Sequence, residues 1–135
     1  MQLKTKLSPS NLKEFNSWVG SIYVSAVESG CYGIGYWCEV LSHKYKNDKD
    51  FKGVIKMSAE YQDEKDKRIS KLRKYNIDRN VIIRGIKRIA SGKIKVCHEY
   101  VSDCVTFLAT GEGDFDGDAA DIIVQAGLFN EVIFG

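Results

Sequence analysis

The sequence predicts an α+β fold in a single domain of residues 1–135, built from an N-terminal helix, a two- to three-stranded antiparallel sheet and three C-terminal helices. Apolar residues recur at helical spacing near the start of the chain and again through its last sixty residues. Between these regions, aromatic and β-branched residues are interleaved with polar ones, which is typical of strands. No repeat or linker divides the chain, and 135 residues are an ordinary length for one domain.

Ser8 and Pro9 predict where the first helix begins, because serine caps helix N-termini and proline is tolerated in the first helical turn. Gly30 suits the left-handed position that follows the last turn. Between them, apolar residues at helical spacing form one stripe: Leu12, Phe15, Trp18, Val19, Ile22, Tyr23, Ala26 and Val27.

Three segments are predicted to pair as an antiparallel meander: 33–41, 53–61 and the weaker 68–75. In the first, Gly33 and Gly35 would lie on the same strand face. The polar residues between the first two segments would connect them, with Asn47–Asp48 as a turn. A charged helix over 63–74 is the alternative to the third strand. The inward residues of the second strand would be Ile55, Met57, Ala59 and Tyr61.

Asp78 predicts the N-cap of a second helix, which Gly92 ends. Its apolar face would hold Val81, Ile82, Ile86, Ile89 and Ala90. A third helix is predicted over Val96–Thr110, and Asp116 or Asp118 would cap a fourth. The fourth would carry Ile122, Ile123, Ala126 and Phe129. The apolar segment Val132–Phe134 is expected to dock on the core or on a partner.

The net charge of +2 conceals two segments of opposite sign. Residues 65–95 hold twelve Lys or Arg against two acids, a net charge of +10, whereas residues 96–135 hold eight acids and no Lys or Arg. Residues 1–64 carry eight basic and eight acidic residues, so their net charge is zero. The two segments predict charged binding surfaces; the alternative is that they neutralise each other within the fold or at an interface between copies of the chain.

The basic segment predicts a phosphate-binding face on the third strand and the helix that follows. A tyrosine beside it would stack on a base. The predicted ligand-binding residues are Arg73, Lys74, Tyr75, Arg84, Lys87, Arg88 and Lys95.

The acidic segment contains an incomplete calcium-loop pattern, in which Asp114, Asp116 and Asp118 match but Ala119 and Gln125 occupy the positions of the glycine and the glutamate. Acids in a first helical turn are favoured by the helix dipole, so capping is the preferred interpretation. Asp118 and Asp121, one turn apart, form a possible carboxylate pair, but no second catalytic group lies nearby in sequence. We therefore expect no enzyme, no metal and no cofactor; the alternative is a metal-dependent enzyme that uses Asp114, Asp116, Asp118 and Asp121.

The four cysteines, Cys31, Cys38, Cys97 and Cys104, form two pairs whose spacing exceeds that of common zinc ligands. Cys97 and Cys104 would share a helix face. With no apolar segment typical of a signal peptide or a membrane span, a reducing compartment is expected, so the cysteines are predicted to be structural free thiols.

The closing residues 118–135, which follow the pattern D-x-x-D-x-I-x-Q-x-x-L-F-x-x-V-I-F-G, resemble the ending of a family of small proteins of tailed phages and prophages. Arg84–Gly85–Ile86 and Tyr36–Trp37 also resemble features of that family. The resemblance implies an origin in a mobile element and carries no activity over. Small phage proteins without catalytic motifs often act against host defences, which makes an anti-CRISPR-like role an expectation from context.

The sequence thus leads to the expectation of a phage-encoded, non-catalytic binding protein that inhibits a host defence component through charged surfaces. The alternative is a nucleotide-messenger sponge or nucleic-acid-binding protein that uses residues 65–95; a phage structural role is a further possibility. Its partner would be a host defence protein or that protein's nucleic-acid or nucleotide ligand, with no membrane partner and a possible homo-oligomer. The expected location is the host cytoplasm. The predicted partner-binding residues are Asp114, Asp116, Asp118, Asp121 and Phe134.

Overall fold

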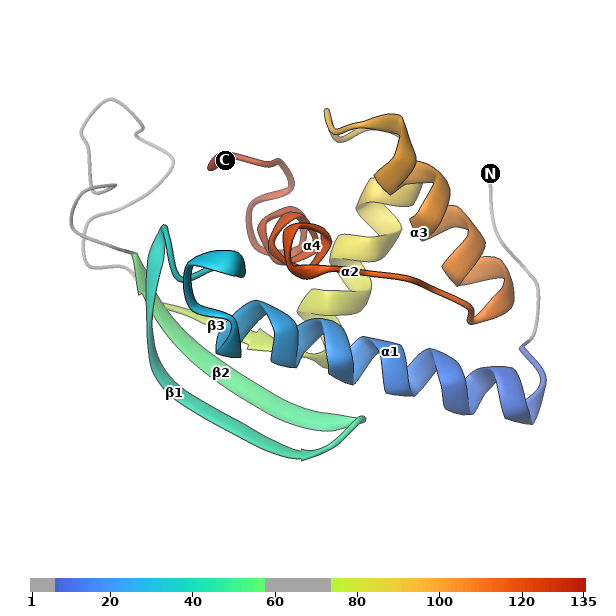
Figure 1. The fold of residues 1–135 in the computed structure, drawn as a ribbon, viewed down its shortest axis with the longest axis horizontal. Helices are drawn as coiled ribbons and strands as arrows, with labels where there is room; N and C mark the ends of the chain where they lie inside the picture. The colour runs from blue at the N-terminus through green and yellow to red at the C-terminus, as the bar shows by residue number, and fades with distance from the viewer. Residues whose placement is uncertain (1–6, 58–73) are drawn as a thin grey trace.

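The computed structural model describes residues 7–57 and 74–135. The strands follow one another along the chain, and so do the last three helices. In order they are α1 (Pro9–Glu28), the short 3₁₀ helix η1 (Gly30–Tyr32), β1 (Cys38–Asn47), β2 (Asp50–Met57), β3 (Lys74–Asp78), α2 (Arg79–Ala90), α3 (His98–Thr110) and α4 (Gly117–Phe129). Figure 1 shows α1 lying along the sheet, with α4 seen end-on in the middle and α2 and α3 behind and beside it. One helix, a three-stranded antiparallel sheet and three further helices confirm the predicted α+β class.

The sheet has the order β1-β2-β3, so β2 is the central strand of an antiparallel meander. The Asn47 side chain accepts a 2.9 Å hydrogen bond from the Lys49 amide and closes the turn between β1 and β2, as predicted. Ile55 and Met57 are buried, which confirms half of the inward set of the second strand. Ala59, Tyr61 and most of the predicted third strand lie outside the described residues.

The first strand lies several residues later than the sequence predicts. Residues 33–37 form tight turns against the end of α1: the Ile34 amide donates to the Ala26 carbonyl, and a Cβ at Gly33 would overlap that same oxygen. Gly33 is therefore needed for close approach to a helix, and the predicted shared strand face with Gly35 is wrong. The polar residues 43–47 are strand instead: β1 is an edge strand, and successive residues 44–47 are all exposed, so this end has no buried face that would produce an alternating pattern.

Helix α1 begins and ends as predicted and packs on the sheet. The Ser8 hydroxyl accepts from the Asn11 amide at 3.2 Å, and Gly30 adopts φ +56° after the last turn. The Tyr23 ring stacks on Phe51 of β2 with ring centroids 4.3 Å apart. Gly53 leaves the space that the tyrosine ring occupies, since a Cβ there would lie 2.9 Å from the Tyr23 hydroxyl.

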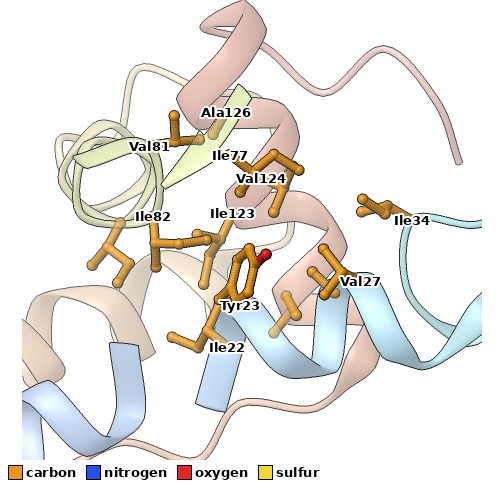
Figure 2. Packing of buried hydrophobic residues seen from close by; sticks show 14 of the residues in the cluster. Ile22, Tyr23, Val27, Ile34, Ile77, Val81, Ile82, Ile123, Val124 and Ala126 are labelled. Atoms are coloured by element: carbon orange, nitrogen blue, oxygen red, sulfur yellow. The ribbon is translucent and has the colours of Figure 1, made fainter. Parts of the chain in front are cut away.

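Helix α4 lies in the centre of the helical layer and is buried on nearly all sides. Figure 2 shows Ile123, Val124 and Ala126 of α4 among buried side chains of α1 and α2. Gly85 of α2 and Gly127 of α4 let the two helices meet closely, because a Cβ at either would overlap a backbone carbonyl of the other helix. An apolar helix of this kind is the core element of the fold.

The N-cap residues of α2 and α4 are ones that the sequence predicts, whereas α3 begins two residues later than predicted. The side chains of Asp78 and Asp116 accept from the amides of Val81 and Ala119 at 3.0 and 2.8 Å. Helix α3 begins at His98 with Cys97 as its N-cap residue, so the predicted sharing of a helix face by Cys97 and Cys104 is wrong. Cys97 is exposed, while Cys104 is buried. None of the helices in the described part of the chain combines the length and apolar character that a bilayer crossing requires.

Candidate functional site

Four cationic side chains from the basic segment surround a cleft of about 660 Å³ beside α2. Asn80, Ser91 and Asn130 add polar groups to its lining, and Ile83 and Ile94 add apolar surface. No Asp or Glu from the described part of the chain lines it. We call this site the basic cleft, and its cations are Arg84, Lys87, Arg88 and Lys93.

Two of these cations are held in place by the end of α4. The Arg84 Nε donates to the Gly127 carbonyl at 2.8 Å, and the Arg88 Nη1 donates to the carbonyls of Ala126 and Gly127 at 2.9 and 3.0 Å. The last carbonyls of a helix lack intrahelical donors and carry partial negative charge, so both arginines cap α4. A guanidinium has five N–H donors, and these contacts leave several for a ligand.

The structure brings together only part of the predicted phosphate-binding set. Arg84, Lys87 and Arg88 share the basic cleft, and Lys93 joins them. Lys95 lines a different cavity, and Lys74 and Tyr75 lie on β3, where the Tyr75 ring packs edge-on against Phe129. Arg73 lies outside the described residues.

The two charged segments do not neutralise each other through close ion pairs within the described residues. Among residues 7–57 and 74–135, the one ion pair within 4 Å joins His43 Nε2 to Glu28 Oε1 at 3.5 Å, and neither residue belongs to either segment. Arg84 and Arg88 of α2 donate to backbone carbonyls, and Arg79 donates to the Asn16 side-chain oxygen at 2.6 Å, so none of these bonds goes to a carboxylate. The basic cleft therefore keeps its positive charge.

The predicted partner-binding acids divide into an exposed group and a buried residue. Asp114, Asp116 and Asp118 are exposed around the N-terminus of α4. Asp121 is only 7% exposed. Among residues 7–57 and 74–135, no three His, Cys, Asp or Glu side chains lie close enough together to hold a metal ion.

Asp121 is the centre of a hydrogen-bond cluster that joins α4 to the residues before β1. Its Oδ2 accepts from the Tyr36 hydroxyl at 2.6 Å, and its Oδ1 accepts from the Trp37 Nε1 at 2.8 Å and from the Gln125 Nε2 at 3.0 Å. Burial raises the pKa of Asp121, and the three hydrogen bonds oppose that rise because they stabilise the ionised form.

Gln125 extends this cluster to the end of the chain. Its Oε1 accepts from the amides of Ile133 and Phe134 at 2.9 and 2.8 Å, and its Nε2 donates to the Phe134 carbonyl at 3.1 Å. The Phe134 ring stacks on Trp37 with centroids 5.1 Å apart. The apolar segment 132–134 is thus half-buried on the protein's own core, which is one of the two outcomes that the sequence predicted.

A second polar contact that the sequence does not reveal joins α1 to β1. The Tyr23 hydroxyl and the His43 Nδ1 lie 2.7 Å apart, and the His43 ring also approaches Glu28. Burial raises the pKa of Tyr23 to about 12, so the phenol stays protonated at neutral pH. The contact anchors the edge strand to the helix.

The cysteines are free thiols, two buried and two exposed. Burial raises the pKa of both Cys38 and Cys104 to about 12, which keeps these thiols unreactive. Their packing in the core agrees with a structural role.

Several residues on which the expected resemblance to phage proteins rests have structural roles in this fold. Asp121 and Gln125 hold the chain end, Arg84 caps α4, and Gly85 permits the close crossing of α2 and α4. Comparison of the chain with protein-family models, with curated proteins and with solved structures found no match.

Proposed function

We propose that this chain is a non-catalytic binding protein that holds a phosphate-bearing ligand in the basic cleft. The observation that carries the proposal is the gathering of Arg84, Lys87, Arg88 and Lys93 around one concavity with no carboxylate among its described lining residues. Phosphate groups are recognised by such clusters through charge-assisted hydrogen bonds and counterion release.

The geometry of the cleft supports this proposal in a second way. The Arg84 and Arg88 side chains are already ordered by their bonds to α4, so a ligand would not have to immobilise them. Arginine also matches phosphate with two parallel donors, which gives geometric specificity. Lys87 and Lys93 are exposed and would add charge without such positioning.

The resemblance to phage proteins suggests which phosphate-bearing ligand is relevant. A protein used against host defences would act by occupying the nucleic acid or nucleotide on which a defence component depends. In this proposal the ligand is taken by the basic cleft, and the exposed acids Asp114, Asp116 and Asp118 form a second charged surface that would suit a basic groove on the defence protein.

The proposal is tested by fluorescence anisotropy with a labelled single-stranded oligonucleotide, with unlabelled nucleotides as competitors. The variant should combine Lys87→Glu and Lys93→Glu, since these residues line the cleft without capping α4. The matched control combines Lys44→Glu and Lys52→Glu, which change the same charge at exposed, paired positions of β1 and β2. We expect binding to fall at least about tenfold in the first variant only. Equal loss in both variants, or no binding by the parent protein, contradicts the proposal.

A further inference from the structure

A second cavity, of about 490 Å³, lies between the first half of α4, the start of α3 and the end of the chain. It shares no lining residue with the basic cleft. The buried Asp121 and its partner Tyr36 both line it, together with Tyr100, Asp118 and Lys95. The proposed function uses the carboxylate of Asp118 as part of an exposed surface, but it assigns no ligand to this cavity.

The charge of Asp121 lacks a close cationic partner within the described part of the chain. The three groups that donate to its carboxylate, from Tyr36, Trp37 and Gln125, are all neutral. A buried carboxylate without a cation is costly, and its cost falls when a positive charge comes near. An ionised carboxylate has about four acceptor positions, so one remains, on the Oδ2 that Tyr36 already contacts.

The electrostatic surroundings of the cavity favour a positive ligand. Asp118 stands on the cavity wall one helical turn before Asp121. Burial raises the pKa of Tyr100, and Asp116, Asp118 and the nearby Cys97 and Glu99 raise it further, as expected in a negative field. Lys95 is the single Lys or Arg among the described residues that line the cavity.

The rest of the lining indicates which kind of cation would fit. The lining includes three aromatic residues, Tyr36, Tyr100 and Phe134, and the apolar residues Val96 and Ile122. A guanidinium is planar, stacks on aromatic rings and is more weakly hydrated than an ammonium, so it loses less on entering such a site.

We infer that this cavity binds a guanidinium group, with the carboxylates of Asp121 and Asp118 as acceptors and the rings of Tyr36 and Tyr100 as walls. The group would come from an arginine side chain of a partner protein or from a small free guanidinium compound. The ammonium of Lys95 also lines the cavity and would repel a bound guanidinium.

The test is a titration with argininamide, followed by NMR through the indole N–H signals. The protein has two tryptophans: Trp37 donates to Asp121, whereas Trp18 packs against Phe115 elsewhere and serves as the internal control. We expect the Trp37 signal to shift, the Trp18 signal to stay, and citrullinamide, the neutral counterpart, to bind at least about tenfold more weakly. Equal effects of the two amides overturn the inference.

Variants that change the charge of the cavity show whether it binds a cation or an anion. Asp118→Asn should weaken argininamide binding several-fold, and Asp121→Asn should abolish the Trp37 response, whereas Asp103→Asn, on an exposed position outside the cavity, should change nothing. Lys95→Gln should tighten binding, and weaker binding in that variant would mean that the cavity takes an anion, which overturns the inference. The Asp118 and Lys95 variants keep the test valid if the Asp121 variant fails to fold.

Two further measurements complete the test. Affinity should increase between about pH 4 and pH 7, because the guest requires the ionised form of Asp121; an affinity that falls over this range contradicts the inference. A short peptide with a central arginine distinguishes the two sources. Tighter binding of the peptide than of argininamide identifies a partner's side chain, and weaker binding identifies a free compound.

Discussion

The indole nitrogen of Trp37 donates a 2.8 Å hydrogen bond to the buried carboxylate of Asp121, 84 positions later in the chain. Tyr36 donates to the second oxygen of the same carboxylate. Two neighbouring aromatic residues before β1 are thereby fixed to the middle of α4. Because Gln125 bonds both to Asp121 and to the backbone of residues 133 and 134, one polar cluster joins the residues before β1, the central helix and the chain end.

Replacement of Asp121 by alanine should destabilise the protein strongly. The change leaves the Trp37 indole, the Tyr36 hydroxyl and the Gln125 amide without their acceptor in a buried place, at a cost of about 2–4 kcal/mol. Urea denaturation measures it. Asp118→Ala removes an exposed carboxylate on the same helix and should cost less than about 1 kcal/mol; similar costs for the two variants would mean that the cluster contributes little.

The stability of the protein should depend on pH through Asp121. Burial raises the pKa of this group above its ordinary value of 3.8, so the folded state holds the proton more tightly than the unfolded state. The contribution of the group is greatest below pH 3.8 and is lost as the pH rises through the folded pKa. As the pH rises from 3.8 through the folded pKa, the free energy of unfolding of the parent protein should therefore fall relative to that of the Asp121→Asn variant. A constant difference between the two profiles would show that the pKa is not raised.

Replacement of Gln125 by leucine should release the chain end. The amides of Ile133 and Phe134 lose their acceptor, so their hydrogen exchange should become much faster. The Asn130 amide, which donates to the Ala126 carbonyl at 3.0 Å, should keep its protection and serves as the reference. Unchanged exchange at positions 133 and 134 would mean that ring packing on Trp37 alone holds the segment.

Replacement of Gly85 by alanine should separate α2 from α4. Alanine is the better helix former by about 1 kcal/mol, but the added methyl overlaps the Ile123 carbonyl, so we expect a net loss of about 2–4 kcal/mol. Gly92→Ala is the control: it places the methyl in open space at φ +77°, and the strained conformation should cost about 1–2 kcal/mol. Thermal unfolding compares them, and a stabilising Gly85→Ala would contradict the close crossing.

The sequence predicts the helices well because their signals are local. The Asp78 cap, the spacing of the isoleucines in α2 and the glycines after α1, α2 and α3 are all read within a few residues. The beginning of β1 is missed, since Gly33 and Tyr36 resemble a strand in composition, whereas contact with the end of α1 and with Asp121 holds this segment in turns. Local patterns cannot show that contact.

The candidate site is predicted less completely, for the same reason. Arg84, Lys87 and Arg88 are found from charge and helical spacing, but their capping of α4 depends on a helix forty positions away. Asp121 is interpreted as a surface acid, although its apolar neighbours Ala120 and Ile122 and a glutamine one turn later are a signal of a buried polar pair. Two of its three donors, Tyr36 and Trp37, come from the other half of the chain.

The salt dependence of oligonucleotide binding tests the basic cleft most directly. If four cations contact phosphates of a single strand, the logarithm of the binding constant should fall with the logarithm of the salt concentration with a slope of about −3. The combined Lys87→Glu and Lys93→Glu variant should lose about half of that slope, while the Lys44→Glu and Lys52→Glu control should keep it. Binding that is insensitive to salt, or that has the same slope in both variants, would contradict a phosphate-binding cleft on α2.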